Sequence, residues 1–198
     1  MASKFLRNCK EGNLDRVLTY LNSGKDVQVY YTYNPGVKFS PLGIAAFNGH
    51  LAVVQALILL EKDMNMENVP DDFYPAIHAA AYVGEIEILE IILNSYKNIN
   101  VQNKTGQTAL QLAASNGKIE TVKYLLSRGA KILLDNSQHS PIDHARNRGH
   151  YNVVKLFSDW PQIVTLQTLC LRSILDNEVN TDNQPPLLLK FWDEIKDD

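Results

Sequence analysis

The sequence predicts an all-α fold: a solenoid of five helix pairs with short hairpin loops, followed by a smaller helical segment. A turn glycine recurs at spacings of 37, 35, 33 and 32 residues, at Gly12, Gly49, Gly84, Gly117 and Gly149. An apolar or Ala-containing segment precedes each glycine, and a second apolar segment follows it. A single pair of short helices cannot bury its apolar faces alone, so this recurrence predicts a stack of similar units.

Residues 105–130 show the unit most clearly. The Ala-rich run from Thr108 to Ser115 predicts a first helix. Asn116-Gly117 ends it, because glycine accepts the positive φ of a tight turn between helices. A second helix follows from apolar residues at i, i+3, i+6 and i+7, namely Ile119, Val122, Leu125 and Leu126. Gly129 then ends this second helix.

The nine residues before the five glycines are SKFLRNCKE, SPLGIAAFN, PAIHAAAYV, TALQLAASN and SPIDHARNR. Parts of the pattern Thr-Pro-Leu-His-x-Ala occur in Ser40-Pro41-Leu42, Ile77-His78-Ala79-Ala80 and Ser140-Pro141-Ile142. With the Gly-His pairs at 49–50 and 149–150, the chain resembles the ankyrin-repeat family over about residues 1–157. The resemblance implies a concave face, lined by hairpin fingers and first helices, that binds a protein partner.

Composition narrows the function classes. The net charge of −3, with no basic cluster, argues against binding to nucleic acid. No apolar run is long enough to span a bilayer, and the N-terminal residues lack the apolar centre of a signal peptide. The two cysteines, Cys9 and Cys170, lie far apart in the sequence, which suits a reducing compartment. We therefore expect a cytoplasmic protein, with the nucleus as the alternative, and no contact with membranes.

The candidate catalytic and metal-binding residues suggest no enzyme. Cys9 stands where the other units have a small residue, so we expect a buried structural thiol rather than a nucleophile. His139 and His144 lie near Asp143 without a second pair of ligands, which argues against zinc. The remaining histidines occupy repeat positions and are expected to bridge backbone groups of neighbouring units: His50, His78 and His150. No phosphate-binding loop or nucleophile motif is present, and we expect neither catalysis nor a cofactor.

Two long connectors carry the candidate partner-binding residues. Residues 25–39 surround an Asn-Pro-Gly turn with alternating aromatic residues, which predicts a projecting hairpin. Residues 62–74 form a second long finger. The rings predicted to contact a partner are Tyr30, Tyr31, Tyr33, Phe39, Phe73 and Tyr74. The alternative is that some of them cover the neighbouring hairpin. Asp71 and Asp72 suit a cation, a basic partner or simply a solvated turn.

The repeats are predicted to end at Phe157, which divides the chain into an array at 1–157 and a tail at 158–198. In the fifth unit, Asp143, Arg146 and Arg148 replace apolar or small residues, which suggests a place near the edge of the array. In the tail, one helical stripe sits at i, i+3, i+4 and i+8: Leu166, Leu169, Cys170 and Ile174. Pro185-Pro186 then opens a second apolar segment.

The tail resembles a SOCS box. Residues 165–174, TLQTLCLRSI, match every position of its elongin-binding part, which implies that Leu166, Leu169, Cys170 and Ile174 contact elongin C. The cullin-selecting part normally reads Leu-Pro-aliphatic-Pro. Only its last proline is kept, and the resemblance places Pro186, Leu189 and Trp192 towards a cullin. It implies a substrate-recognition adaptor of an elongin B/C–cullin–RING ubiquitin ligase. The alternative is a non-enzymatic scaffold or inhibitor whose tail only caps the repeats.

Overall fold

A computed structural model describes residues 2–24, 31–34, 37–61, 75–95 and 98–160. Within these residues the chain forms ten helices and one two-stranded hairpin. The predicted all-α repeat array is therefore confirmed for the described part of the chain. The predicted helical tail lies outside the described residues, apart from its first three positions.

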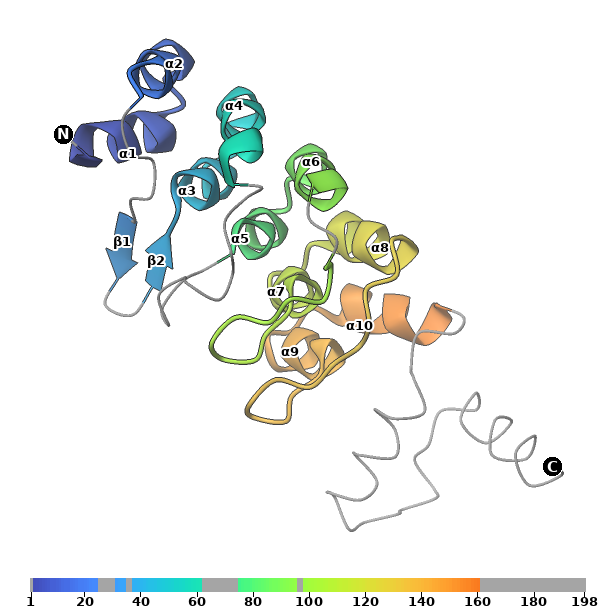
Figure 1. Cartoon of the computed structure of the whole chain (residues 1–198). Helices are drawn as coiled ribbons and strands as arrows, with labels where there is room; N and C mark the ends of the chain where they lie inside the picture. Colours follow the sequence, from blue (N-terminus) through green and yellow to red (C-terminus); the bar gives the residue numbers. More distant parts are fainter. Residues whose placement is uncertain (1, 25–30, 35–36, 62–74, 96–97, 161–198) are drawn as a thin grey trace, which may run out of the picture. The chain divides into compact units, whose positions relative to one another are not determined.

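The helices form five pairs, numbered here as repeats 1 to 5. The first helices are α1 (Ala2–Glu11), α3 (Pro41–Phe47), α5 (Ala76–Val83), α7 (Ala109–Ser115) and α9 (Pro141–Asn147). The second helices are α2 (Leu14–Asn22), α4 (Leu51–Glu61), α6 (Ile86–Ser95), α8 (Ile119–Ser127) and α10 (Tyr151–Asp159). Each first helix contacts the next first helix and each second helix contacts the next second helix, which gives the two rows seen in Figure 1.

Capping residues explain where the first helices begin. Ser40 accepts a hydrogen bond from the backbone N–H of Gly43 at 3.0 Å, and Pro41 occupies the first helical position, where it needs no hydrogen-bond donor. Thr108 and Gln111 form a reciprocal capping box at the start of α7. Gly117 has a φ of 66°, as predicted for the turn between α7 and α8.

The predicted hairpin before α3 is also present. Strands β1 (Tyr31–Asn34) and β2 (Val37–Phe39) pair antiparallel, with Tyr31 opposite Phe39 and a register shift between Thr32 and Asn34. The hairpin lies beside the row of first helices, on the side away from the second helices (Figure 1). It therefore adds a finger to the edge of the array.

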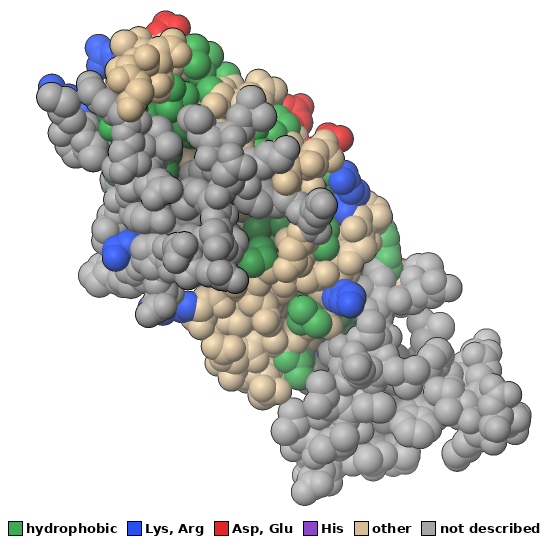
Figure 2. Space-filling view, in the orientation of Figure 1, with side chains coloured by type: hydrophobic (Ala, Val, Ile, Leu, Met, Phe, Trp, Pro, Cys, Tyr) green, Lys and Arg blue, Asp and Glu red, His purple; other side chains and the backbone are tan. Residues whose placement is uncertain are grey.

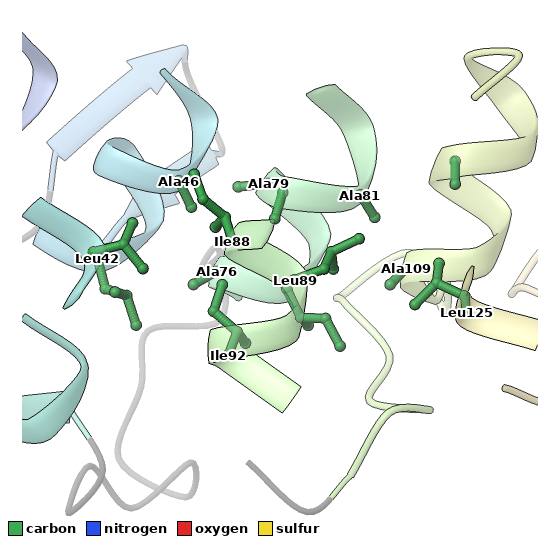
Figure 3. Packing of buried hydrophobic residues seen from close by; sticks show 14 of the residues in the cluster. Leu42, Ala46, Ala76, Ala79, Ala81, Ile88, Leu89, Ile92, Ala109 and Leu125 are labelled. Atoms are coloured by element: carbon green, nitrogen blue, oxygen red, sulfur yellow. The ribbon is translucent and has the colours of Figure 1, made fainter. Parts of the chain in front are cut away.

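The core runs along the whole array and mixes small and large side chains. Alanines at one position of four first helices, Ala45, Ala80, Ala113 and Ala145, are all 0% exposed, so neighbouring helices approach closely. Large side chains from the second helices, such as Ile88, Leu89 and Ile92, fill the space between the rows (Figure 3). Burying each large side chain contributes roughly 1.5–3 kcal/mol. Cys9 is fully buried in this core, which confirms the predicted burial of its thiol.

The array extends slightly beyond its predicted end. Helix α10 continues to Asp159, two residues past Phe157, and its Val153 and Phe157 are buried against the core. No helix in the described part of the chain is both long and apolar enough to cross a bilayer.

Candidate protein-binding surface

Polar side chains link successive repeats at the fourth position of the nine-residue segments. His78 donates from Nε2 to the carbonyl oxygen of Gln107 at 2.8 Å. Gln111, at the same position of repeat 4, donates from Nε2 to the carbonyl oxygen of His139 at 2.8 Å. Each acceptor immediately precedes the N-cap residue of the next first helix. The two different side chains therefore make the same link between neighbouring repeats.

The histidines at repeat positions are structural. Burial lowers the pKa of His78 from 6.5 to about 4, and its backbone hydrogen bonds offset only part of that shift. His78 is thus neutral near pH 7. His50 donates from Nε2 to the carbonyl oxygen of Lys10 at 2.8 Å, so repeats 1 and 2 are bridged as predicted. The ring of His150 lies against Gly117 and leaves no room for a Cβ there.

Asp135 holds together the finger between α8 and α9, residues 128–140, through its hydrogen bonds. Its Oδ2 accepts a hydrogen bond from Nε2 of His144 at 2.8 Å, and its Oδ1 accepts from the backbone N–H groups of Ser137 and His139, both at 2.9 Å. Burial raises the pKa of Asp135, but these hydrogen bonds outweigh burial and the net pKa is lowered. The carboxylate therefore holds both the finger and His144 in place.

Asp143, one of the residues taken to indicate a place near the edge of the array, has a structural role that its sequence pattern did not reveal. Its Oδ2 accepts hydrogen bonds from the backbone N–H and the hydroxyl of Ser140, at 2.9 and 2.6 Å. Asp143 thus closes a capping box at the start of α9 and is buried, whereas Arg146 and Arg148 are exposed. Across the described ranges, no group of three His, Cys, Asp or Glu side chains could hold a metal ion.

A row of three aromatic rings crosses from the hairpin to repeat 3. The rings of Phe39 and Phe47 have centroids 5.3 Å apart, and those of Phe47 and Tyr82 stack with centroids 5.7 Å apart. Phe39 is 2% exposed, so its ring belongs to the core and is not available to a partner, contrary to the prediction for this residue. Tyr82 is 40% exposed and offers its ring at the other end of the row.

The sequence interpretation missed Phe47 and Tyr82. Both occupy the eighth position of the nine-residue segments, just before the turn between the two helices. The same position in the other repeats is polar: Lys10, Ser115 and Asn147. Two aromatic residues at an otherwise polar repeat position were the signal that could have identified them.

The other predicted site residues lie in strand β1 or outside the described residues. Tyr31 and Tyr33 lie in strand β1. The remaining partner-binding residues, Tyr30, Phe73 and Tyr74, lie outside the described residues. So do the elongin-binding set, Leu166, Leu169, Cys170 and Ile174, and the cullin-facing set, Pro186, Leu189 and Trp192. All of these assignments stay predictions.

The family model described as ankyrin repeats in three copies matches residues 5–103 and 77–168, which is most of the chain. The chain belongs to the ankyrin-repeat family. The matched residues include the turn glycines and the polar links between repeats described above. Ankyrin arrays are protein–protein interaction modules, and the described part of the chain is such an array.

The chain matches only a part of each of three curated relatives. A putative E3 ubiquitin-protein ligase, XBAT31 from Arabidopsis thaliana, is 33% identical over 109 residues, which is 54% of this chain and 24% of the relative. The ankyrin repeat and KH domain-containing protein mask-1 from Caenorhabditis elegans is 32% identical over 136 residues, covering 65% of this chain and 5% of the relative. Alpha-latrocrustotoxin-Lt1a from Latrodectus tredecimguttatus is 34% identical over 108 residues, covering 54% and 7%. The chain thus spans less than a quarter of each of these relatives.

Proposed function

We propose that this ankyrin-repeat protein is the substrate-recognition adaptor of an elongin B/C–cullin–RING ubiquitin ligase. The array binds a protein substrate, and the tail binds elongin C through Leu166, Leu169, Cys170 and Ile174. Pro186, Leu189 and Trp192 face the cullin. The protein performs no chemistry itself and acts in the cytoplasm, or in the nucleus. It raises the local concentration of the substrate near the ubiquitin-charged enzyme.

The observation that carries this proposal is the ten-residue match at 165–174, directly after an ankyrin array. Leu166, Cys170 and Ile174 share one face of the predicted helix, and the small Cys side chain lets a partner approach closely. Relatives named as E3 ubiquitin-protein ligases, such as XBAT31, agree with the ubiquitin part of the proposal.

The proposed substrate face combines the first helices with the fingers. Its aromatic part consists of Tyr82, stacked on the half-buried Phe47, together with the tyrosines of the hairpin. Aromatic side chains provide large contact areas at low entropic cost and often dominate binding energy. Phe39 is left out of this face because it is buried.

One observation favours the alternative of a scaffold or inhibitor with a capping tail. Ile142 is half-buried, whereas the residues at the same position of the other repeats are almost fully buried: Phe5, Leu42, Ile77 and Leu110. Apolar surface at the last repeat is what a cap would cover. The two functions make opposite predictions about binding to elongin B/C.

The test is a binding assay between the full-length chain and purified elongin B/C. We expect the wild type to bind and the variant Leu166→Ala with Cys170→Ala to lose at least about a hundredfold in affinity, because both side chains would be central contacts. The matched control is Thr168→Ala with Arg172→Ala, on the opposite face of the predicted helix, which is expected to bind like the wild type.

Thermal unfolding of the same variants without elongin separates the two functions. If the tail is a docking segment, the Leu166→Ala, Cys170→Ala variant should melt close to the temperature of the wild type. If the tail is a cap, the same variant loses packing against the array and should melt at a clearly lower temperature. Failure of a folded wild-type protein to bind elongin B/C would overturn the adaptor proposal and leave an ankyrin interaction module.

A further inference from the structure

The first repeat has a groove on its outer face that the proposed function does not use. Helices α1 and α2 line a depression of about 510 Å³. Most of the lining residues follow the i, i+3, i+4 and i+7 spacing of a helix face, so one face of each helix borders the groove. The lining residues are Lys4, Phe5, Arg7, Asn8 and Glu11 on α1, Arg16, Thr19 and Tyr20 on α2, and Ser23, the C-cap residue of α2.

The repeat alignment shows that the corresponding face of the other repeats is buried. Arg7 stands where repeats 2 to 4 have the buried Ile44, Ala79 and Leu112. Arg16 stands where repeats 2 to 5 have the buried Val53, Ile88, Thr121 and Val153. Among the described helices, repeats 2 to 5 each contact a preceding repeat, and repeat 1 contacts only the following one. The face that a preceding helix pair covers elsewhere is therefore the face that carries the groove.

This face is not suited to another apolar repeat. The arginines replace aliphatic or small side chains, and Asn8 replaces an alanine that is 0% exposed in every other repeat. Burying such unpaired charges against an apolar helix pair would cost several kcal/mol. The face that is apolar in the other repeats is therefore cationic in repeat 1.

The groove is positively charged, which favours a negatively charged partner. Three cationic side chains, Lys4, Arg7 and Arg16, face one carboxylate, Glu11, which gives the groove a net charge of +2 in a chain whose net charge is −3. All four are exposed, and Figure 2 shows both basic and acidic side chains on the surface at this end of the array. Tyr20 stacks on Phe5, with ring centroids 4.1 Å apart, and adds an aromatic wall.

We propose that this groove binds an acidic helical segment of a partner protein. The carboxylates of the segment pair with Lys4, Arg7 and Arg16, and one apolar side chain packs beside Tyr20. The segment occupies the place that a preceding helix pair occupies in repeats 2 to 5. The site uses neither the tail nor the fingers, so its partner is bound independently of elongin and of a substrate held by the fingers and the first helices of repeats 2 to 5.

The probe for this proposal is a fluorescein-labelled helical peptide with Glu at i, i+3, i+4 and i+7 and one Leu on the same face. Its binding to the full-length chain is followed by fluorescence anisotropy. We expect binding at low salt that weakens as the salt rises towards ~0.15 M, because exposed ion pairs are screened. The same peptide with Gln in place of Glu is expected not to bind.

Charge reversal tests the residues. Arg7→Glu with Arg16→Glu should weaken binding of the Glu peptide at least about tenfold, since attraction becomes repulsion. Arg16→Glu lies in the first turn of α2, where a carboxylate favours the helix, so folding should be retained. The matched control, Lys131→Glu with Lys155→Glu, makes the same charge change at exposed positions away from the groove and should weaken binding less than about twofold.

A charge swap keeps the test decisive if the reversed variant is less stable. The Arg7→Glu, Arg16→Glu variant is expected to bind the corresponding Lys peptide, which a merely unfolded protein would not do selectively. The proposal is overturned if the folded wild type does not bind the Glu peptide, if the Gln peptide binds equally well, or if both variant pairs lose the same affinity.

Discussion

Replacing Gly106 by alanine is expected to lower the free energy of unfolding by about 3 kcal/mol. Gly106 has a φ of 77°, and a Cβ there would lie 2.6 Å from the backbone nitrogen of Asn136. That nitrogen donates a hydrogen bond to the carbonyl oxygen of Thr105 at 3.1 Å. The new Cβ would thus meet a backbone atom that is itself held by a hydrogen bond. The backbone of Asn136 cannot move aside without separating the loop before α9 from the loop before α7.

The matched control for Gly106→Ala is Gly129→Ala. Gly129 has a φ of 85°, so alanine is similarly strained there, but a Cβ would meet nothing within 4 Å. This variant should lose only about 1 kcal/mol, the cost of the backbone conformation alone. Urea denaturation followed by circular dichroism measures both variants. Equal losses in the two would show that close packing of the fingers contributes nothing to stability.

Lowering the pH from 7 to 5 is expected to destabilise the array by about 2 kcal/mol through His78. The pKa of His78 is about 4 in the folded protein and 6.5 when the side chain is solvated. As the pH falls below 6.5, the unfolded chain binds a proton that the folded protein does not bind. The contribution is therefore fully present above pH 6.5 and is lost progressively towards pH 4. Asp135, whose folded pKa is lowered, contributes stability that is lost only at more acidic pH.

The variant His78→Gln tests this pH dependence. Gln111 makes the same link one repeat further on with a side chain that does not titrate. Glutamine at position 78 is therefore expected to donate an equivalent hydrogen bond. Urea denaturation between pH 7 and 5 should show a smaller loss for His78→Gln than for the wild type. A full pH dependence in His78→Gln would contradict the assignment.

Local patterns in the sequence were sufficient to predict the helices, the turns and the hairpin. Asn116-Gly117 and Ser40-Pro41 act within a few residues, so their effects can be read from the sequence directly. The links between repeats were harder to predict. The pattern of His78 indicated a bridge, but the equivalent role of Gln111 depends on a carbonyl group 28 residues away that stacking brings near.

The aromatic part of the candidate surface also depends on contacts between residues that are far apart in the sequence. Tyr82 and Phe47 are 35 residues apart, and only the packing of α5 against α3 makes them one aromatic surface. Phe39 illustrates the opposite error, because an aromatic residue in a hairpin predicts contact with a partner or with the core equally well. Its position beside α3 decides for the core.

The same repeat position holds a titratable side chain, His78, in repeat 3 and a non-titratable one, Gln111, in repeat 4. This difference determines which junction between repeats is weakened at acidic pH. An array held by contacts between nearest neighbours opens first at its weakest junction. Below pH 6.5 the junction formed by His78 weakens, while the one formed by Gln111 does not. Separation of repeats 1 to 3 from repeats 4 to 5 therefore costs less free energy in acid than at pH 7. A partner held only by repeats 1 to 3, around Tyr82, would be unaffected by this opening, whereas a partner that spans the junction would be bound less tightly on acidification.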